Sequence, residues 1–157
     1  MVGALSGKDV EPDMKAKFWL AVLAYVIPTF PLGYFWHLST FKAQYDALAV
    51  YRVDVIIPMG LASMIIQGLL FAWLYPKLFS TAQDQWTRSA VKFFLLFTIL
   101  AWSFLVLPVA AKFNMTSVAQ FMALETAFTL IQYAVTAPLI ALAWRDRVPL
   151  ASAANPT

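Results

Sequence analysis

The sequence contains no cysteine and only one histidine, and both shortages exclude classes of function. Without cysteine there is no disulfide framework, no thiolate metal site and no thiol redox chemistry. A single histidine excludes every metal site that needs two or more imidazoles from one chain. A glycine-rich phosphate loop, a G-x-S-x-G motif and an H-E-x-x-H motif are also missing. The sequence therefore favours a protein that is not an enzyme and that carries no cofactor.

Charged residues are scarce as well, at 12% of 157 residues, whereas 62% are hydrophobic and the mean hydropathy is +0.73. A soluble domain is usually about 25% charged and about 45–50% apolar. This composition excludes an ordinary soluble domain, a disordered chain and a collagen-like chain. It predicts a protein that crosses a membrane several times.

Four apolar runs stand out, at residues 18–38, 55–75, 93–111 and 121–144. Each is close to the roughly 20 helical residues that span a hydrocarbon core about 30 Å thick. Lipid offers the backbone no hydrogen-bond partners, so each run is predicted to be a helix. The predicted fold is all-α, an antiparallel transmembrane four-helix bundle over 18–144. A polar cytoplasmic N-terminus at 1–17 precedes it and a cytoplasmic tail at 145–157 follows it.

Basic residues between the runs indicate the orientation, and we attribute the net charge of +3 to topology rather than to nucleic-acid binding. The first and third loops hold three lysines and arginines: Lys42, Arg52 and Lys112. The N-terminus, the second loop and the tail hold eight: Lys8, Lys15, Lys17, Lys77, Arg88, Lys92, Arg145 and Arg147. Both termini are therefore expected in the cytoplasm of a multi-pass cell-membrane protein.

Proline occurs in all four runs and predicts kinked helices, since it removes a backbone hydrogen bond. We expect the kinks to shape the packing rather than to act as moving hinges. The prolines in the runs are Pro28, Pro31, Pro58, Pro108 and Pro138.

The loops are also patterned. In the first loop, 39–54, Phe41, Tyr45, Leu48 and Arg52 recur at helical spacing, which predicts a short helix lying in the outer membrane interface. The second loop, 76–88, is expected on the inner surface. The third loop, 112–117, is short, so spans three and four are predicted to form an antiparallel hairpin.

Polar residues inside the apolar runs are the best indication of function, because such groups are costly in lipid and usually face the bundle interior. In the fourth run they form one stripe at spacings of four, three and four: Glu125, Thr129, Gln132 and Thr136. The second run carries a similar stripe: Gly60, Ser63 and Gln67. We expect spans two and four to face each other or to share a cavity. Both glutamines should point inward to form interhelical hydrogen bonds.

A second set of polar residues is predicted at one membrane level on the outer side: His37, Tyr45, Arg52, Asp54 and Glu125. We expect Glu125 within contact reach of Arg52, His37 or Asp54, because an unpaired carboxylate in hydrocarbon is costly. The favoured interpretation is a structural ion pair of Arg52 with Glu125 or Asp54. The alternatives are a small outward-facing binding site and, less favoured, a metal site formed by His37, Asp54 and Glu125.

Two short stretches and one tyrosine carry a resemblance: PLGYFWH at 31–37, Tyr45, and FAWLY at 71–75. With the acidic Glu125 in the last span, they resemble small four-span bacterial inner-membrane proteins of unknown function. The resemblance implies a bacterial inner-membrane setting and a four-helix bundle. It implies no activity.

Three hypotheses about function follow. The first is an interaction or structural subunit that packs in the bilayer against a larger membrane protein or a second copy of itself. The second is a binder or carrier of a lipid or another small apolar ligand, since kinked helices rich in Phe and Met suit an apolar pocket. The third is a subunit of a proton- or ion-coupled transporter that uses Glu125 and His37. An enzyme acting on a lipid ranks last, because no nucleophile–base pair is recognisable.

Overall fold

The computed structural model describes residues 7–146, with side chains from residue 13 onward, and this part of the chain holds helices and no strand. Four helical stretches are long and apolar enough to cross a membrane: Asp13–Thr40, Ile57–Leu78, Trp86–Lys112 and Val118–Trp144. The predicted fold class, an all-α four-helix bundle, is confirmed. The chain is compatible with an integral membrane protein by the length and composition of these helices.

Eight helical elements make up these stretches and the first connection. The long helices are α1 (Gly7–Phe35), α3 (Ile57–Leu78), α4 (Trp86–Ala101) and α6 (Val118–Trp144). Helix α2 (Lys42–Leu48) lies in the first connection, and α5 (Leu107–Lys112) completes the third span. Two π-helical turns, η1 (Trp36–Thr40) and η2 (Trp102–Val106), follow α1 and α4.

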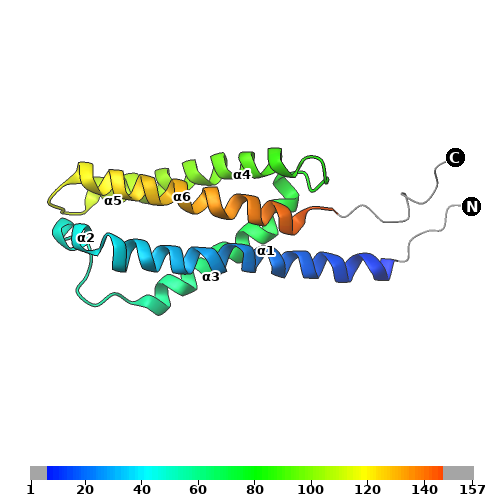
Figure 1. Cartoon of the computed structure of the whole chain (residues 1–157), viewed down its shortest axis with the longest axis horizontal. Helices are drawn as coiled ribbons and strands as arrows, with labels where there is room; N and C mark the ends of the chain where they lie inside the picture. Colours follow the sequence, from blue (N-terminus) through cyan, green and yellow to red (C-terminus); the bar gives the residue numbers. More distant parts are fainter. Residues whose placement is uncertain (1–6, 147–157) are drawn as a thin grey trace, which may run out of the picture.

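Each of the four long helices runs antiparallel to the long helix that precedes it in the chain (Figure 1). The N-terminal part of α1 and the C-terminal part of α6 lie at one end of the bundle, which we name the terminal end, and α2 lies at the other, the α2 end (Figure 1). Helix α1 packs against both α3 and α6, and α4 packs against α6, whereas α3 and α6 touch only lightly. Spans two and four were expected to face each other or to share a cavity, and they meet only in part, through ring contacts such as Phe71 with Tyr133 at 6.1 Å.

Several helix boundaries differ from those predicted. Helix α1 begins at Gly7, within the predicted polar N-terminus, and α3 includes Pro76, which was predicted to open a loop. The third span begins at Trp86 rather than near 93. Hydropathy marks the part of a helix that suits hydrocarbon, and the backbone hydrogen bonds continue beyond it where polar side chains extend the helix into water. Arg147 and the rest of the predicted tail lie outside the described residues.

The prolines fall into two groups. Pro58 and Pro108 lie in the first turns of α3 and α5, where a missing N–H leaves no intrahelical bond unmade. The wider π turn η2 directly precedes α5, of which Pro108 is the second residue, and lets the third span continue as a helix through this proline. Pro76 and Pro138 lie inside α3 and α6, and Pro28 and Pro31 lie inside α1. The kinks expected at these positions stay a prediction.

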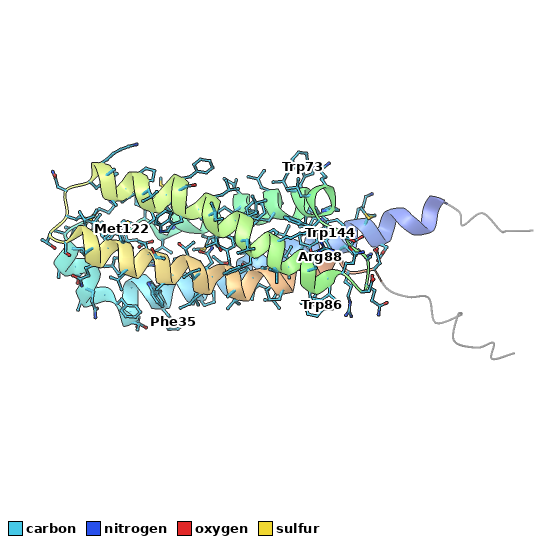
Figure 2. All side chains as sticks on the ribbon, turned by 90° about the horizontal axis from the view of Figure 1, so that it is seen from above. Phe35, Trp73, Trp86, Arg88, Met122 and Trp144 are labelled. Carbon is cyan, nitrogen blue, oxygen red and sulfur yellow. The ribbon has the colours of Figure 1, made fainter. Side chains whose placement is uncertain are left out.

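Aromatic rings fill the core toward the terminal end. Phe71 of α3 makes ring contacts with Tyr25 of α1 at 4.9 Å and with Phe97 of α4 at 4.6 Å between centroids. Phe93 of α4 completes the cluster, 5.4 Å from Phe71. These side chains join α3 and α4, whose backbones lie too far apart to pack directly. Trp73, Trp86 and Arg88 lie toward the same end (Figure 2), as an aromatic belt at a membrane interface would.

Helix α2 closes the opposite end of the bundle. Tyr45 and Leu48 are fully buried and pack in one apolar cluster with Val106 and Phe121. The Thr116 hydroxyl donates to the carbonyl of Ala47 at 2.7 Å, and the Thr116 N–H donates to the carbonyl of Leu48 at 3.2 Å. The predicted short helix is therefore present, but its apolar face packs into the bundle instead of into the interface. Its helical spacing also stops before Arg52.

The terminal end is held by a polar contact among three segments. Lys17 of α1 donates to Asp146, just after α6, at 3.0 Å, and also pairs with Asp13 at 3.2 Å. The Thr81 hydroxyl, in the α3–α4 connection, donates to the other Asp146 oxygen at 2.8 Å. Partial burial of Asp146 disfavours its charged form, but the bonds from Lys17 and Thr81 and the charge of Lys17 outweigh it and lower the pKa of Asp146. The ionised carboxylate therefore stabilises the fold.

We expect Asp146→Asn to lower the free energy of unfolding at pH 7 by about 0.2–1 kcal/mol, since the carboxylate is more than half exposed. The folded pKa lies below the ordinary value of about 3.9, so the contribution is present above that value and is lost as the pH falls through the folded pKa. Thermal unfolding in mild detergent should show the stabilities of Asp146→Asn and the parent converging as the pH falls through the folded pKa of Asp146. Asp84→Asn changes an exposed carboxylate in the α3–α4 connection. It is the control and should show no such pH-dependent loss of stability.

Candidate functional site

Three residues from three elements meet at the α2 end, and we name them the Glu125 cluster: His37 of η1, Tyr45 of α2 and Glu125 of α6. Glu125 is only 8% exposed and lies about two turns inside α6. The Tyr45 hydroxyl donates to Glu125 Oε1 at 2.8 Å, and His37 Nε2 lies 3.4 Å from the same oxygen. The predicted contact between Glu125 and His37 is thus present in the structure.

His37 is placed by the π turn that follows α1. Its Nδ1 lies 2.9 Å from the Gly33 carbonyl one turn earlier, and the ring packs against Phe128 with centroids 4.4 Å apart. Tyr45 packs on its other side, at 5.0 Å, and stacks in parallel on Tyr51 at 4.8 Å. The orientation of the imidazole is therefore fixed by contacts on both sides of the ring and by one hydrogen bond.

The hydrogen bonds of His37 determine where its protons lie. A carbonyl oxygen only accepts, so Nδ1 must carry a proton to bond with Gly33. In a neutral imidazole Nε2 would then be an acceptor facing another acceptor, Glu125 Oε1. A favourable contact at this position requires one further proton, as imidazolium with carboxylate or as imidazole with carboxylic acid. Either form leaves the pair neutral overall, which a low-dielectric environment favours.

Tyr45 supports this arrangement from α2. Its burial, and next the negative charge that Glu125 can carry beside it, raise the pKa of Tyr45. The phenol therefore keeps its proton and donates it to Glu125. Chemically, the Glu125 cluster is a buried carboxylate that accepts from Tyr45 and lies 3.4 Å from the imidazole of His37.

The other two residues predicted at this level lie elsewhere. Arg52 and Asp54 are exposed on the connection between α2 and α3, and within residues 13–146 neither forms an ion pair with Glu125 or with the other. The favoured ion pair is therefore not formed. The helical spacing that suggested it fails because α2 ends at Leu48 and the chain turns through Ala49, whose φ of 57° is left-handed. Among the described residues no group of three His, Asp or Glu side chains suits a metal, so His37, Asp54 and Glu125 form no such site.

The polar stripes of α3 and α6 are joined by Tyr25 of α1, which is not among the predicted site residues. The Tyr25 hydroxyl, on α1, donates to Gln67 Oε1 of α3 at 2.5 Å and accepts from Gln132 Nε2 of α6 at 2.8 Å. Gln67 also donates to Ser63 at 3.3 Å. Both glutamines thus point into the bundle as predicted, but each bonds to α1 instead of to the other. A four-residue spacing on α1 could have indicated this face: Ala21, Tyr25, Thr29, Gly33 and His37.

The remaining stripe residues have other partners. Thr129 and Thr136 donate to the carbonyls of Glu125 and Gln132 in their own helix, at 2.7 and 2.9 Å. Gly60 is exposed, and a Cβ added there would meet nothing within 4 Å, so it does not mediate close helix packing. Gly68 has that role instead, because its added Cβ would lie 3.0 Å from Val26 Cγ2 of α1.

A pocket of about 530 Å³ opens beside the Glu125 cluster, between α1, α3 and the connection that precedes α3. Its walls are mostly apolar, and His37 belongs to both the pocket wall and the Glu125 cluster. Its lining residues are Phe30, Gly33, Tyr34, His37, Leu38, Val50, Tyr51, Arg52, Val55, Ile56, Ile57, Gly60, Leu61, Met64 and Phe128. In Figure 1, α3 runs obliquely across α1. The lining residues that come from these two helices belong to the C-terminal part of α1 and the N-terminal part of α3.

Comparison of the chain with protein-family models, with curated proteins and with solved structures finds no match. The resemblance to small four-span bacterial membrane proteins therefore stays a prediction. Any function has to be argued from the geometry of this chain.

We expect Tyr25→Phe to lower the free energy of unfolding by about 1–2 kcal/mol, because it removes the hydroxyl that joins Gln67 and Gln132. Tyr34→Phe, on the same helix, is the matched control, since Tyr34 is 45% exposed. It should change stability by less than about 0.5 kcal/mol. Equal stability of the two variants in chemical unfolding would contradict the bridging role.

Substitution of Glu125 separates hydrogen bonding from charge. Glu125→Gln retains an oxygen for Tyr45 and gains an N–H that can donate to His37 Nε2, so we expect a loss of less than about 1 kcal/mol. Glu125→Leu leaves both partners unpaired and should cost about 2–4 kcal/mol. Gln120→Leu, at an exposed position of the same helix, controls for added hydrophobicity. If the Leu variant at 125 were as stable as the parent in thermal unfolding, the cluster would have no structural role.

Proposed function

We propose that this integral membrane protein binds a small apolar or amphipathic molecule in the pocket at the α2 end. The observation that carries the proposal is the pocket itself, about 530 Å³ in volume and lined mostly by apolar side chains. Binding sites for small molecules usually measure about 300–1,000 Å³ and combine apolar walls with a few polar groups. Here the polar groups are His37, Arg52 and the tyrosines at one end of the space.

Gly60 supports a cavity at this position, because a Cβ added there would meet nothing within 4 Å. Gly33 differs, since the flexible end of Met64 already lies 3.2 Å from the position of its Cβ. The open space beside α3 therefore depends on the missing side chain of Gly60, which substitution can supply.

Filling the pocket is the direct test. We expect Gly60→Phe to place its ring in the pocket without a clash and to reduce the amount of copurified small molecule to less than about a tenth of that in the parent. Ala62→Phe adds the same ring to an exposed position of α3 outside the pocket wall and should retain the molecule. Mass spectrometry of extracts from protein purified in mild detergent measures both. Equal retention by both variants, or an empty parent protein, would overturn the proposal.

A proton-linked carrier is the second candidate, and His37 supports it. The same imidazole forms part of the pocket wall and lies 3.4 Å from Glu125, so a bound molecule would contact an ionisable pair directly. A pH-sensitive dye inside proteoliposomes would detect proton movement on addition of ligand. Unchanged internal pH with a ligand that binds would restrict the protein to binding alone.

The setting of the protein and its partners stay predictions from the sequence. The basic residues, eight against three, support an orientation with both termini in the cytoplasm, and the bacterial inner-membrane setting is supported by the resemblance alone. Labelling of introduced single cysteines by an impermeant reagent would test this, and labelling of the terminal end from outside would contradict it. A role as a subunit packed against a larger membrane protein or a second copy rests on composition alone, and native mass measurement in mild detergent tests it.

A further inference from the structure

We propose that the pocket takes an amphipathic acid, a molecule with one carboxylate or phosphate group on an otherwise apolar body, and that Arg52 binds the anionic group. This inference rests on the proposed binding function and specifies the class of ligand. It starts from the charge of the pocket wall. No aspartate or glutamate lines the pocket, and Arg52 is its one lysine or arginine.

Within residues 13–146, Arg52 has no partner in the protein. None of the ion pairs, hydrogen bonds or ring contacts of this part of the chain includes it. Of the nearby carboxylates, Glu125 bonds to Tyr45 and Asp46 pairs with Lys42 at 2.5 Å. Asp54, two residues along the chain, neither pairs with Arg52 in the described part of the chain nor lines the pocket. A guanidinium is always charged and presents N–H groups in a fork that fits a carboxylate or a phosphate. Arg52 is therefore available to an anion at the pocket.

The rest of the pocket suits an apolar body. One wall follows α3 from Ile57 to Met64, about 10 Å along a helix, and Gly33 and Phe30 of α1 form the wall opposite. Phe128 of α6 also contributes to the lining. Arg52 precedes this wall in the connection, so the charged and apolar parts of the pocket lie in the same order as the headgroup and chain of a membrane amphiphile.

The alternatives fit less well. A neutral apolar molecule could contact the same walls, but it would desolvate Arg52 without giving its N–H groups an acceptor. A cationic amphiphile would be repelled by Arg52, and no carboxylate lines the pocket to compensate. His37 already faces a carboxylate oxygen, Glu125 Oε1 at 3.4 Å, whereas Arg52 has no acidic partner among the described residues. The wall thus selects for an anion by charge and for a chain by apolar contact.

The test compares four probes that share one chain: lauric acid, dodecyl phosphate, dodecanol and dodecylamine. Binding to the full chain in zwitterionic nanodiscs at about pH 8, where the acid is ionised, is measured by calorimetry. We expect at least one of the two acids to bind about tenfold or more tightly than dodecanol, the size expected of a charge-assisted hydrogen bond. Dodecylamine should bind least. Tighter binding of lauric acid would indicate a free fatty acid as the ligand, and tighter binding of dodecyl phosphate a phosphate monoester.

Variants assign the preference to Arg52. Arg52→Gln should reduce the affinity for the acid to that for dodecanol, and Arg52→Lys should retain part of it by keeping the charge without the fork. Lys42→Gln is the matched control, a cation on the neighbouring α2 that lies outside the pocket wall, and should leave the preference unchanged. Thermal unfolding confirms that each variant folds, which is expected because Arg52 is exposed and has no partner in the described part of the chain.

The outcomes separate this inference from the binding function on which it rests. If dodecanol binds as tightly as both acids and Arg52→Gln changes nothing, the ligand class is wrong while the pocket still binds. If the acid preference also disappears in Lys42→Gln, surface charge explains it and the assignment to Arg52 fails. If no probe binds saturably to the parent and Gly60→Phe makes no difference, the binding function fails as well.

Discussion

Buried polar groups in a membrane helix must find partners on neighbouring helices, and α1 supplies most of those partners here. The four-residue face that runs through α1 into η1 brings Tyr25 between Gln67 and Gln132 and brings His37 to Glu125. The neighbouring positions of α1 let α3 approach closely, since Gly68 lies against Val26 and the Val22 carbonyl. Because lipid offers no competing hydrogen bonds, these contacts determine which helices are neighbours. The central position of α1 follows from them.

The two ends of the bundle use this constraint differently. Toward the terminal end, aromatic rings from three helices fill the core around Phe71, and Lys17 and Asp146 tie α1 to the end of α6. Toward the α2 end, α3 carries Gly60 where a packed bundle would have a side chain, and the space beside it stays open. The α2 helix closes the bundle over α6 and η2 but leaves the gap between α1 and α3 uncovered. The pocket thus forms where side chains do not fill the space between α1 and α3.

The sequence predicts the four helices well, because the length of an apolar run and the absence of backbone partners in lipid leave no other structure. The stripe on α6 is also predictable, since a 3.6-residue period places Glu125 and Gln132 on one face. The neighbour of that face is not. Tyr25 lies in an apolar run rich in aromatics, and composition does not distinguish a bridging phenol from one that faces lipid. Arg52 was misplaced because helical spacing was extended past Leu48, where the left-handed Ala49 ends α2.

Glu125 and Arg52 at the α2 end differ in whether the protein supplies a partner for their charge, and this difference determines which ligand the site suits. Glu125 is buried and has two partners from two other elements, so its charge is compensated inside the protein. Arg52 is exposed, lines the pocket and has no partner among the described residues. A single structural ion pair between them would have compensated both charges and left a neutral, inert end. Because Tyr45 and His37 take that role toward Glu125, the positive charge of Arg52 remains at the pocket, where a ligand can be the group that pairs with it.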